Sequence, residues 1–180
     1  MAYPYTKKLD FPLKNYKING SRFKEKYVID NIFWGLHLGE DCNVRAGTKV
    51  LAVGRGRVVY SALHSSIQSP KRGGKRNWGN IIIIAHKNPI TKKVFFSLYG
   101  HLSKRFVKKG DKIDKGDVIG KIAKGWTKEN GWWNESHLHF ALYIGPWERK
   151  VLPGYFREGQ KRTKLKHWLE PSKFIKKYSK

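Results

Sequence analysis

Short apolar runs separated by glycine and proline turns fill the chain from Thr48 onward, and they constrain the fold more than any other feature. The runs are "TKVLAV", "RVVYSA", "NIIIIAH", "KKVFFSLY", "DVIGKIA" and "HLHFALY". Branched residues on both sides of Gly54-Arg55-Gly56 predict a hairpin between the first two runs. "NIIIIAH" reads as a buried strand, and "KKVFFSLY" returns after the turn "KNPI". The sequence therefore predicts a mainly β fold of short antiparallel strands.

Three regions are expected along the chain. Residues 1–30 are polar and aromatic without clear periodicity, which indicates an N-terminal extension packed on the domain through Tyr5, Phe11 and Phe23. The domain itself covers residues 31–150.

Residues 151–180 are expected to form a basic C-terminal tail with a short helix. Within them, "WLEPSKFIKKY" would place Pro171 in the first helical turn, where its missing N–H costs nothing.

Two segments of the domain read as loops: residues 64–80 are basic and rich in Gly, Ser and Pro, and residues 124–133 are polar with three tryptophans.

The charge balance of the chain is strongly positive. Its 38 lysine and arginine residues against 13 acidic residues give a net charge of +25, which attracts nucleic acid, acidic lipid or an anionic cell-wall polymer. A single cysteine, Cys42, excludes an intramolecular disulfide framework and any zinc site built from several cysteines. No run approaches the roughly 18 apolar residues of a transmembrane helix. "MAYPYTKKLDFPLKNY" has no apolar signal-peptide core, so either the protein has no leader or its leader lies outside this sequence.

Two pairs of side chains suggest a metal site. "SHLHFALY" places His137 and His139 on one face of a strand, with Cα atoms roughly 6–7 Å apart. In "WGLHLGED", His37 precedes Asp41 by four residues, so an extended chain also shows both on one face. His37, Asp41 and one imidazole of the strand pair would give zinc three protein ligands and leave a fourth position open, as in catalytic zinc sites.

A hydrolytic zinc site also needs a proton acceptor, and the glutamate of an HExxH motif is absent from this sequence. The second imidazole of the strand pair and His101 in "SLYGHL" are the candidates, because unperturbed histidine titrates near neutrality. The remaining histidines, His64, His86 and His167, are not expected to be ligands.

Three motifs in order, "HLGED", "YGHL" and "HLHF", resemble the lysostaphin-type zinc metalloendopeptidases, the LytM-like domains that cut peptidoglycan peptides. The resemblance covers roughly Phe33 to Pro146. It implies an antiparallel β-sheet groove of the duplicated hybrid-motif or barrel-sandwich-like kind. It also implies an extracytoplasmic enzyme acting on peptidoglycan peptides with one zinc ion per chain.

The resemblance also implies a role for each motif residue. His37, Asp41 and His139 match the zinc ligands. His137 matches the catalytic base, and His101 matches the histidine that assists it and stabilises the transition state.

The sequence departs from the family's usual pattern at three places. Arg45 stands where proline is frequent, and Ala141 stands where glutamate often follows "HLHF". "KGWTKENGWWNES" replaces a Gly/Thr-rich loop that forms a groove wall, which leaves substrate choice open. Three tryptophans of this loop could stack on substrate or pack within the protein: Trp126, Trp132 and Trp133.

Other functions compete with the peptidase. A polyanion-binding module would suit the charge, and the basic loop and tail could hold anionic wall polymers, but no recognition helix or RNP-like motif points to specific nucleic acid. A non-catalytic amidase regulator with the same fold is the third possibility. We expect a monomer.

Overall fold

The computed structural model describes residues 3–29, 31–159 and 163–179. Its strands are β1 (Lys26–Ile29), β2 (Ile32–His37), β3 (Glu40–Asn43), β4 (Lys49–Leu51), β5 (Gly56–His64), β6 (Gly79–Lys87), β7 (Val94–Arg105), β8 (Lys112–Ile113), β9 (Val118–Ile122), β10 (His137–Tyr143), β11 (Tyr155–Phe156) and β12 (Trp168–Leu169). The helices are two short 3-10 turns, η1 (Pro70–Arg72) and η2 (Leu165–His167), and α1 (Pro171–Tyr178). None of the described helices has the length and apolar character needed to span a membrane.

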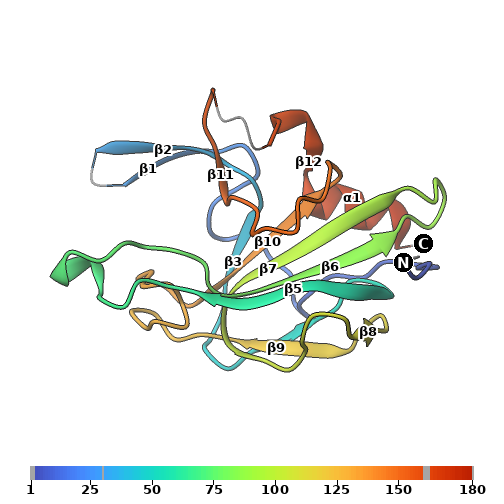
Figure 1. Ribbon diagram of the computed structural model, residues 1–180, viewed down its shortest axis with the longest axis horizontal. Coiled ribbons are helices and arrows are strands. Elements are labelled where there is room, and N and C mark those ends of the chain that lie inside the picture. Colours follow the sequence, from blue (N-terminus) through green and yellow to red (C-terminus); the bar gives the residue numbers. More distant parts are fainter. Residues whose placement is uncertain (1–2, 30, 160–162, 180) are drawn as a thin grey trace.

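The described strands form two antiparallel sheets (Figure 1). The larger sheet has the order β12-β10-β7-β6-β5-β8, with β3 beside β10, β9 beside β7 and β4 beside β9. The smaller sheet has the order β1-β2-β11 and lies above the larger one in Figure 1. The prediction of a mainly β antiparallel fold with a short C-terminal helix is confirmed, although the described strands do not close into a barrel.

Strand β6 explains why the large sheet is stable. Its side chains alternate between two hydrophobic clusters, so that Ile82 and Ile84 face one cluster while Ile81 and Ile83 face the other. All four are fully buried. A strand covered on both faces must be a continuous apolar run, which is how "NIIIIAH" reads.

The predicted hairpin around Gly54-Arg55-Gly56 is wrong. Strand β4 pairs with β9, and β5 pairs with β6 and β8, so β4 and β5 are not neighbours in the sheet. The two glycines provide space for close packing. A Cβ on Gly54 would lie 2.7 Å from Thr6 Oγ1, and one on Gly56 would lie 2.5 Å from Ile84 Cγ2.

The first thirty residues contact the large sheet closely. Leu9 and Leu13 are buried in the same cluster as Ile82. The Tyr5 hydroxyl donates to the Pro89 carbonyl, Phe11 stacks on Tyr16, and Phe23 packs against the second cluster. The division into extension, domain and tail stays a prediction, and residues 160–162 of the basic tail lie outside the described residues.

Helix α1 begins with Pro171, as predicted, and its first turn meets a buried carboxylate on β3. Glu40 Oε2 accepts hydrogen bonds from the Ser172 backbone N–H (3.0 Å) and the Tyr16 hydroxyl (2.7 Å), while Oε1 accepts from Ser172 Oγ (2.7 Å). An anion at a helix N-terminus satisfies N–H groups that have no partner within the helix. These contacts hold the strand that carries the next residue, Asp41.

Candidate functional site

Three strands bring His37, Asp41 and His139 together. His37 ends β2 and Asp41 lies in β3, with a turn at Leu38-Gly39 between the strands. Because the chain turns there, it is not extended from His37 to Asp41, as the sequence prediction assumed; an extended segment would separate their Cα atoms by about 13 Å. His139 on β10 lies directly opposite Asp41 in the antiparallel pair, which sets these side chains side by side.

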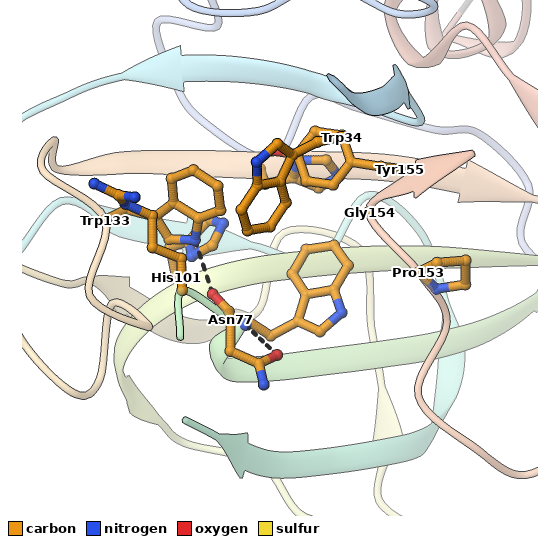
Figure 2. A pocket seen from close by; sticks show the side chains of 10 residues that line it. Trp34, Asn77, His101, Trp133, Pro153, Gly154 and Tyr155 are labelled. Atoms are coloured by element: carbon orange, nitrogen blue, oxygen red, sulfur yellow. Dashed lines mark hydrogen bonds between the residues drawn. The ribbon is translucent and has the colours of Figure 1, made fainter. Parts of the chain in front are cut away.

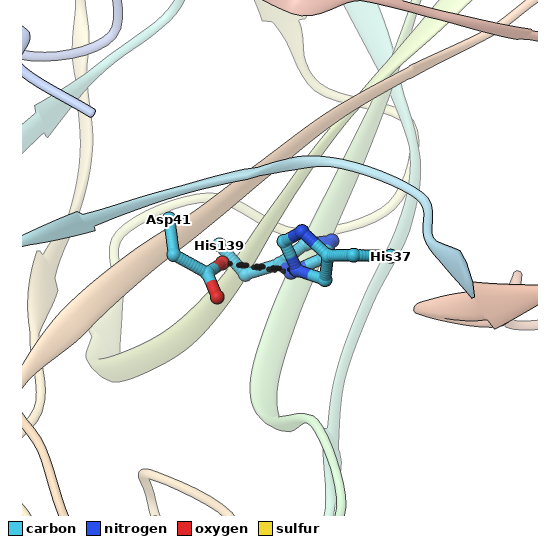
Figure 3. A group of neighbouring side chains, drawn as sticks. All are labelled: His37, Asp41 and His139. Carbon is cyan, nitrogen blue, oxygen red and sulfur yellow. Dashed lines mark hydrogen bonds and ion pairs between the residues drawn. The ribbon is translucent and has the colours of Figure 1, made fainter. Parts of the chain in front are cut away.

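The three side chains point at one another (Figure 3). His37 Nε2 lies 3.3 Å from Asp41 Oδ1, and His139 Nδ1 lies 3.0 Å from the same oxygen. The two ring nitrogens are 2.9 Å apart. All three residues are buried.

This cluster fits a tetrahedral metal ion. Ligands about 2.0–2.1 Å from zinc at tetrahedral angles lie about 3.3 Å from one another, close to the three distances observed. Asp41 Oδ1 is buried and, among the described residues, receives no hydrogen bond of good geometry. Two nitrogens and a carboxylate oxygen therefore converge where a divalent ion would satisfy all three, and this is the group of described residues that could hold a metal.

Backbone groups fix the orientation of the cluster. His37 Nδ1 lies 3.2 Å from the Arg22 carbonyl oxygen, so the ring donates there and keeps its Nε2 lone pair for a metal. Gly39 makes room for His139, since a Cβ at that position would lie 2.6 Å from His139 Nε2 and 2.5 Å from the Phe140 oxygen. The turn between β2 and β3 thus needs glycine for close approach.

Two further imidazoles lie beside the cluster. His101 and His137 have ring centroids 4.3 Å apart, and both are buried. His101 Nδ1 lies 3.0 Å from the Asn130 carbonyl, and His137 Nδ1 lies 3.1 Å from the Glu135 carbonyl. Each neutral ring therefore donates from Nδ1 and keeps Nε2 as a proton acceptor.

His101 also has a strained backbone. Its φ of 65° is uncommon for a residue with a side chain, and the register of β7 against β9 shifts just after it. Backbone strain of this kind persists where the surrounding structure enforces it, and it is concentrated at functional sites.

Burial and one carboxylate set the charge of the cluster. Burial and the neighbouring His37 lower the pKa of His139 to about 4, and burial with His137 and His139 nearby holds the pKa of His101 well below its usual value. Burial opposes ionisation of Asp41, but His37 and His139 hold its pKa well below the usual range. Burial also opposes protonation of His37, yet the Asp41 carboxylate raises the His37 pKa, so a proton and a metal ion compete for this nitrogen.

An aromatic pocket of about 210 Å³ opens beside the imidazoles (Figure 2). His101 and His139 form part of its lining, and the Trp133 indole N–H donates to the Asn77 carbonyl (2.8 Å) at its wall. The rest of the lining is Trp34, Arg76, Trp78, Pro153, Gly154 and Tyr155. Of the three candidate metal ligands, His139 lines the pocket, so the pocket reaches the cluster there.

The chain matches a known family over the residues that build this site. Residues 35–151 match the sequence model of Peptidase family M23. The chain belongs to peptidase family M23.

The chain matches curated relatives over about a fifth of their length and one solved catalytic domain over most of its length. It is 32% identical over 108 residues to the peptidoglycan DD-endopeptidase ShyA of Vibrio cholerae and 31% identical over 110 residues to lysostaphin of Staphylococcus staphylolyticus. These alignments cover 60% and 61% of this chain but only 20% and 19% of the relatives. The catalytic domain of lysostaphin from Staphylococcus simulans has the same fold, with a TM-score of 0.60, 23% identity, and 90% of this chain and 93% of that chain covered.

The M23 region contains all five His and Asp residues singled out in the sequence. The structure brings His37, Asp41 and His139 together and sets His101 and His137 next to them. Their division into ligands, base and assistant stays a prediction.

The other histidines of the chain lie in separate environments. His86 is buried between the Arg55 carbonyl and Ser97 Oγ, His64 contacts Tyr60, and His167 packs edge-on against Tyr143.

The three tryptophans of the replaced loop have different surroundings. Trp133 lines the aromatic pocket. Trp126 is half exposed, with the cationic groups of Lys71 and Arg76 each under 6 Å from its ring centroid. Trp132 donates from Nε1 to the Ser66 carbonyl and so ties residues 124–133 to residues 64–80. Substrate contact by these residues stays a prediction, and Trp133 has the most suitable position.

Several pocket residues were not identified from the sequence. Trp34, Trp78 and Tyr155 come from β2, the end of a basic loop and β11, and no motif joins them. Trp78 stacks edge-on against His139 and donates from Nε1 to the Leu152 carbonyl. Only "NWGN" before a buried strand offered a hint, since a large aromatic in a polar loop needs a partner.

Proposed function

We propose that this protein is a zinc metalloendopeptidase that hydrolyses peptides of bacterial peptidoglycan. The supporting observation is the convergence of His37 Nε2, Asp41 Oδ1 and His139 Nδ1 within 3.3 Å of one another, beside two further imidazoles. The names of the relatives support the substrate class. They include a peptidoglycan DD-endopeptidase and a glycyl-glycine endopeptidase of Staphylococcus capitis, 31% identical over 106 residues. Such a substrate implies action outside the cytoplasm.

Zinc fits the donor set best, because two imidazoles and one carboxylate are typical zinc ligands and leave one position open. A solved structure with 25% identity and a TM-score of 0.58 is described as a zinc-containing peptidase from Vibrio cholerae. When bound, zinc would supply Lewis-acid catalysis. We propose one ion per chain, held by His37, Asp41 and His139.

The remaining imidazoles would move the protons. His137 Nε2 takes a proton from the attacking water, whose oxygen bonds to the scissile carbonyl carbon. The proton stays on His137 or passes from it to the adjacent His101, and the imidazolium that carries it donates a hydrogen bond to the developing oxyanion. The C–N bond then breaks, and the leaving amine takes the proton from the imidazolium. His101 is neutral beforehand because burial and neighbouring imidazoles keep its pKa low.

The aromatic pocket would receive the substrate residue next to the scissile bond. Its walls are rigid, since Trp133 donates to the Asn77 carbonyl and Trp78 to the Leu152 carbonyl. These indoles exclude water from the pocket, and without water the charge interactions at the reacting carbonyl become stronger.

Digestion of purified sacculi tests the proposal. Metal-replete protein is incubated with sacculi of several wall types, and mass spectrometry identifies each new amine, which also identifies the bond cut. We expect release of peptide fragments that a chelator or His137→Ala abolishes, whereas His64→Ala, which removes an imidazole outside the cluster, keeps the activity. Zinc binding and wall binding without any new amine would instead identify a non-catalytic regulator.

A further inference from the structure

A row of lysines crosses three neighbouring strands of the large sheet. Lys49 on β4 lies directly opposite Lys121 on β9, and Lys121 lies directly opposite Lys104 on β7. Residues directly opposite in antiparallel pairs share one face, and strands are spaced by about 4.8 Å. Lys49 and Lys104 are exposed, and Lys121 is half-buried. We call Lys49, Lys121 and Lys104 the lysine row.

The lysine row destabilises the sheet through repulsion between its like charges. Like charges directly opposite on paired strands destabilise a sheet. Among the described residues, no carboxylate lies within ion-pair distance of these three ammonium groups. An anionic partner outside the chain would remove this repulsion.

A groove lined partly by residues of β4 and β9 adjoins the row at Lys49. It has a volume of about 700 Å³ and includes Lys49 in its lining, together with Lys14 and Arg45. Of the ten described residues that line it, none is acidic and none is aromatic. The groove and the aromatic pocket share no lining residue, so this is a separate site. Strand β9 lies along the lower edge of the molecule in Figure 1.

The chemistry of the groove selects one kind of polyanion. Proteins that bind single-stranded nucleic acid combine a basic groove with aromatic side chains on which bases stack, and the groove has none. No described helix offers a recognition element for duplex DNA there, because the lining comes from strands and turns. A concave surface suits a flexible chain better than a flat bilayer.

We propose that the lysine row and its groove bind a linear phosphodiester polymer without bases, such as poly(glycerol phosphate). Its phosphates would sit between the ammonium groups of Lys49, Lys121 and Lys104, with Arg45 and Lys14 continuing the track. The proposal goes beyond the hydrolytic function and does not depend on it.

Binding of labelled poly(glycerol phosphate) to the full chain, followed by fluorescence anisotropy at several salt concentrations, tests the proposal. The variant Lys49→Gln/Lys104→Gln/Lys121→Gln should lose about tenfold or more in affinity, and its log–log salt slope should fall by about 2, since each lost phosphate contact contributes about 0.7. The matched control Lys166→Gln/Lys173→Gln/Lys176→Gln removes the same charge from exposed positions elsewhere and should change the affinity by less than about threefold.

A melting measurement and a single-residue variant separate loss of binding from loss of folding. The lysine-row variant should melt at the parent's temperature or above it, because repulsion between the lysines is removed. Lys121→Gln, which removes only the central charge, carries the same test if the triple variant folds poorly. Equal losses in the lysine-row and control variants would overturn the proposal. So would tighter binding of an oligo(dT) with the same number of phosphates.

Discussion

Backbone carbonyl oxygens set the chemistry of the individual side chains in this site. His37, His101 and His137 each donate from Nδ1 to a carbonyl of a segment without regular structure, so each presents Nε2 to the site. The protonation pattern therefore depends on where the turns place Arg22, Asn130 and Glu135. The side chains of Arg22, Asn130 and Glu135 affect this pattern only indirectly, because they influence how the turns fold.

Gly39 offers a direct test of packing around the candidate metal ligands. The Gly39→Ala methyl would lie 2.6 Å from His139 Nε2 and 2.5 Å from the Phe140 oxygen, so the imidazole must move. Zinc affinity, measured by competition with a chromophoric chelator, should fall by about 10–100-fold, as when groups that orient metal ligands are altered.

The matched control for Gly39→Ala is Gly47→Asn. Gly47 has open space around it and a φ of +86°, which asparagine tolerates, so zinc affinity should stay unchanged. Equal affinities for Gly39→Ala and the parent would show that His139 is not held where its ring is now placed.

His86 lies outside the candidate metal site, but its titration should make the free energy of unfolding depend on pH. Burial lowers its folded-state pKa from the ordinary 6.5 to about 4. The unfolded chain therefore binds a proton between these values that the folded chain does not, and stability falls as the pH drops through this window. The His86 contribution to the loss between pH 8 and pH 5 is about 2 kcal/mol, at about 1.4 kcal/mol per pKa unit.

Urea unfolding at pH 8 and pH 5 measures the His86 effect. In His86→Gln, which cannot take up a proton, the difference between the two pH values should shrink by about 2 kcal/mol. An unchanged difference would mean that His86 is not buried in its neutral form.

Among the elements, helix α1 and strand β3 depend on each other through Glu40. Glu40→Ala leaves the Tyr16 hydroxyl and the Ser172 N–H without their acceptor, and should cost about 2–4 kcal/mol of unfolding free energy. Ser172→Ala removes one hydrogen bond and should cost about 1 kcal/mol. Urea unfolding checks both, with the exposed Glu148→Ala as the control expected within about 0.5 kcal/mol of the parent. A Glu40→Ala value equal to the control would contradict the role of this carboxylate.

For the molecule as a whole, the candidate metal site joins the two sheets. His37 belongs to β2 of the small sheet, whereas Asp41 and His139 belong to strands of the large sheet. An ion that binds only the folded state adds about 2.7 kcal/mol at a hundredfold excess over its Kd. For a chain of this length, that is about 5–10 °C in melting temperature.

Chelation should therefore lower the melting temperature of the parent by about 5–10 °C, and added zinc should restore it. Differential scanning fluorimetry measures this shift. His139→Ala should melt at the same temperature with and without chelator. A parent that is indifferent to chelator would mean that no ion links the sheets.

Local patterns were sufficient to predict the strands but not all of their partners. "NIIIIAH" and "KKVFFSLY" form β6 and β7 as expected, because their pairing joins neighbours across a short turn. The hairpin at Gly54 failed because the glycines make room for Thr6 and Ile84, contacts that join distant parts of the chain. The order of the motifs identified the five His and Asp residues. Trp34, Trp78 and Tyr155, which line the aromatic pocket, belong to no motif with a recognisable spacing in the sequence.

Zinc content, measured by elemental analysis of purified protein, tests the central claim most directly. We expect one zinc per chain in the parent, none in His139→Ala, and one in His101→Ala, which should nevertheless have lost hydrolysis of sacculi. Zinc retained by His139→Ala, or lost from His101→Ala, would contradict the assignment of His37, Asp41 and His139 as the ligands.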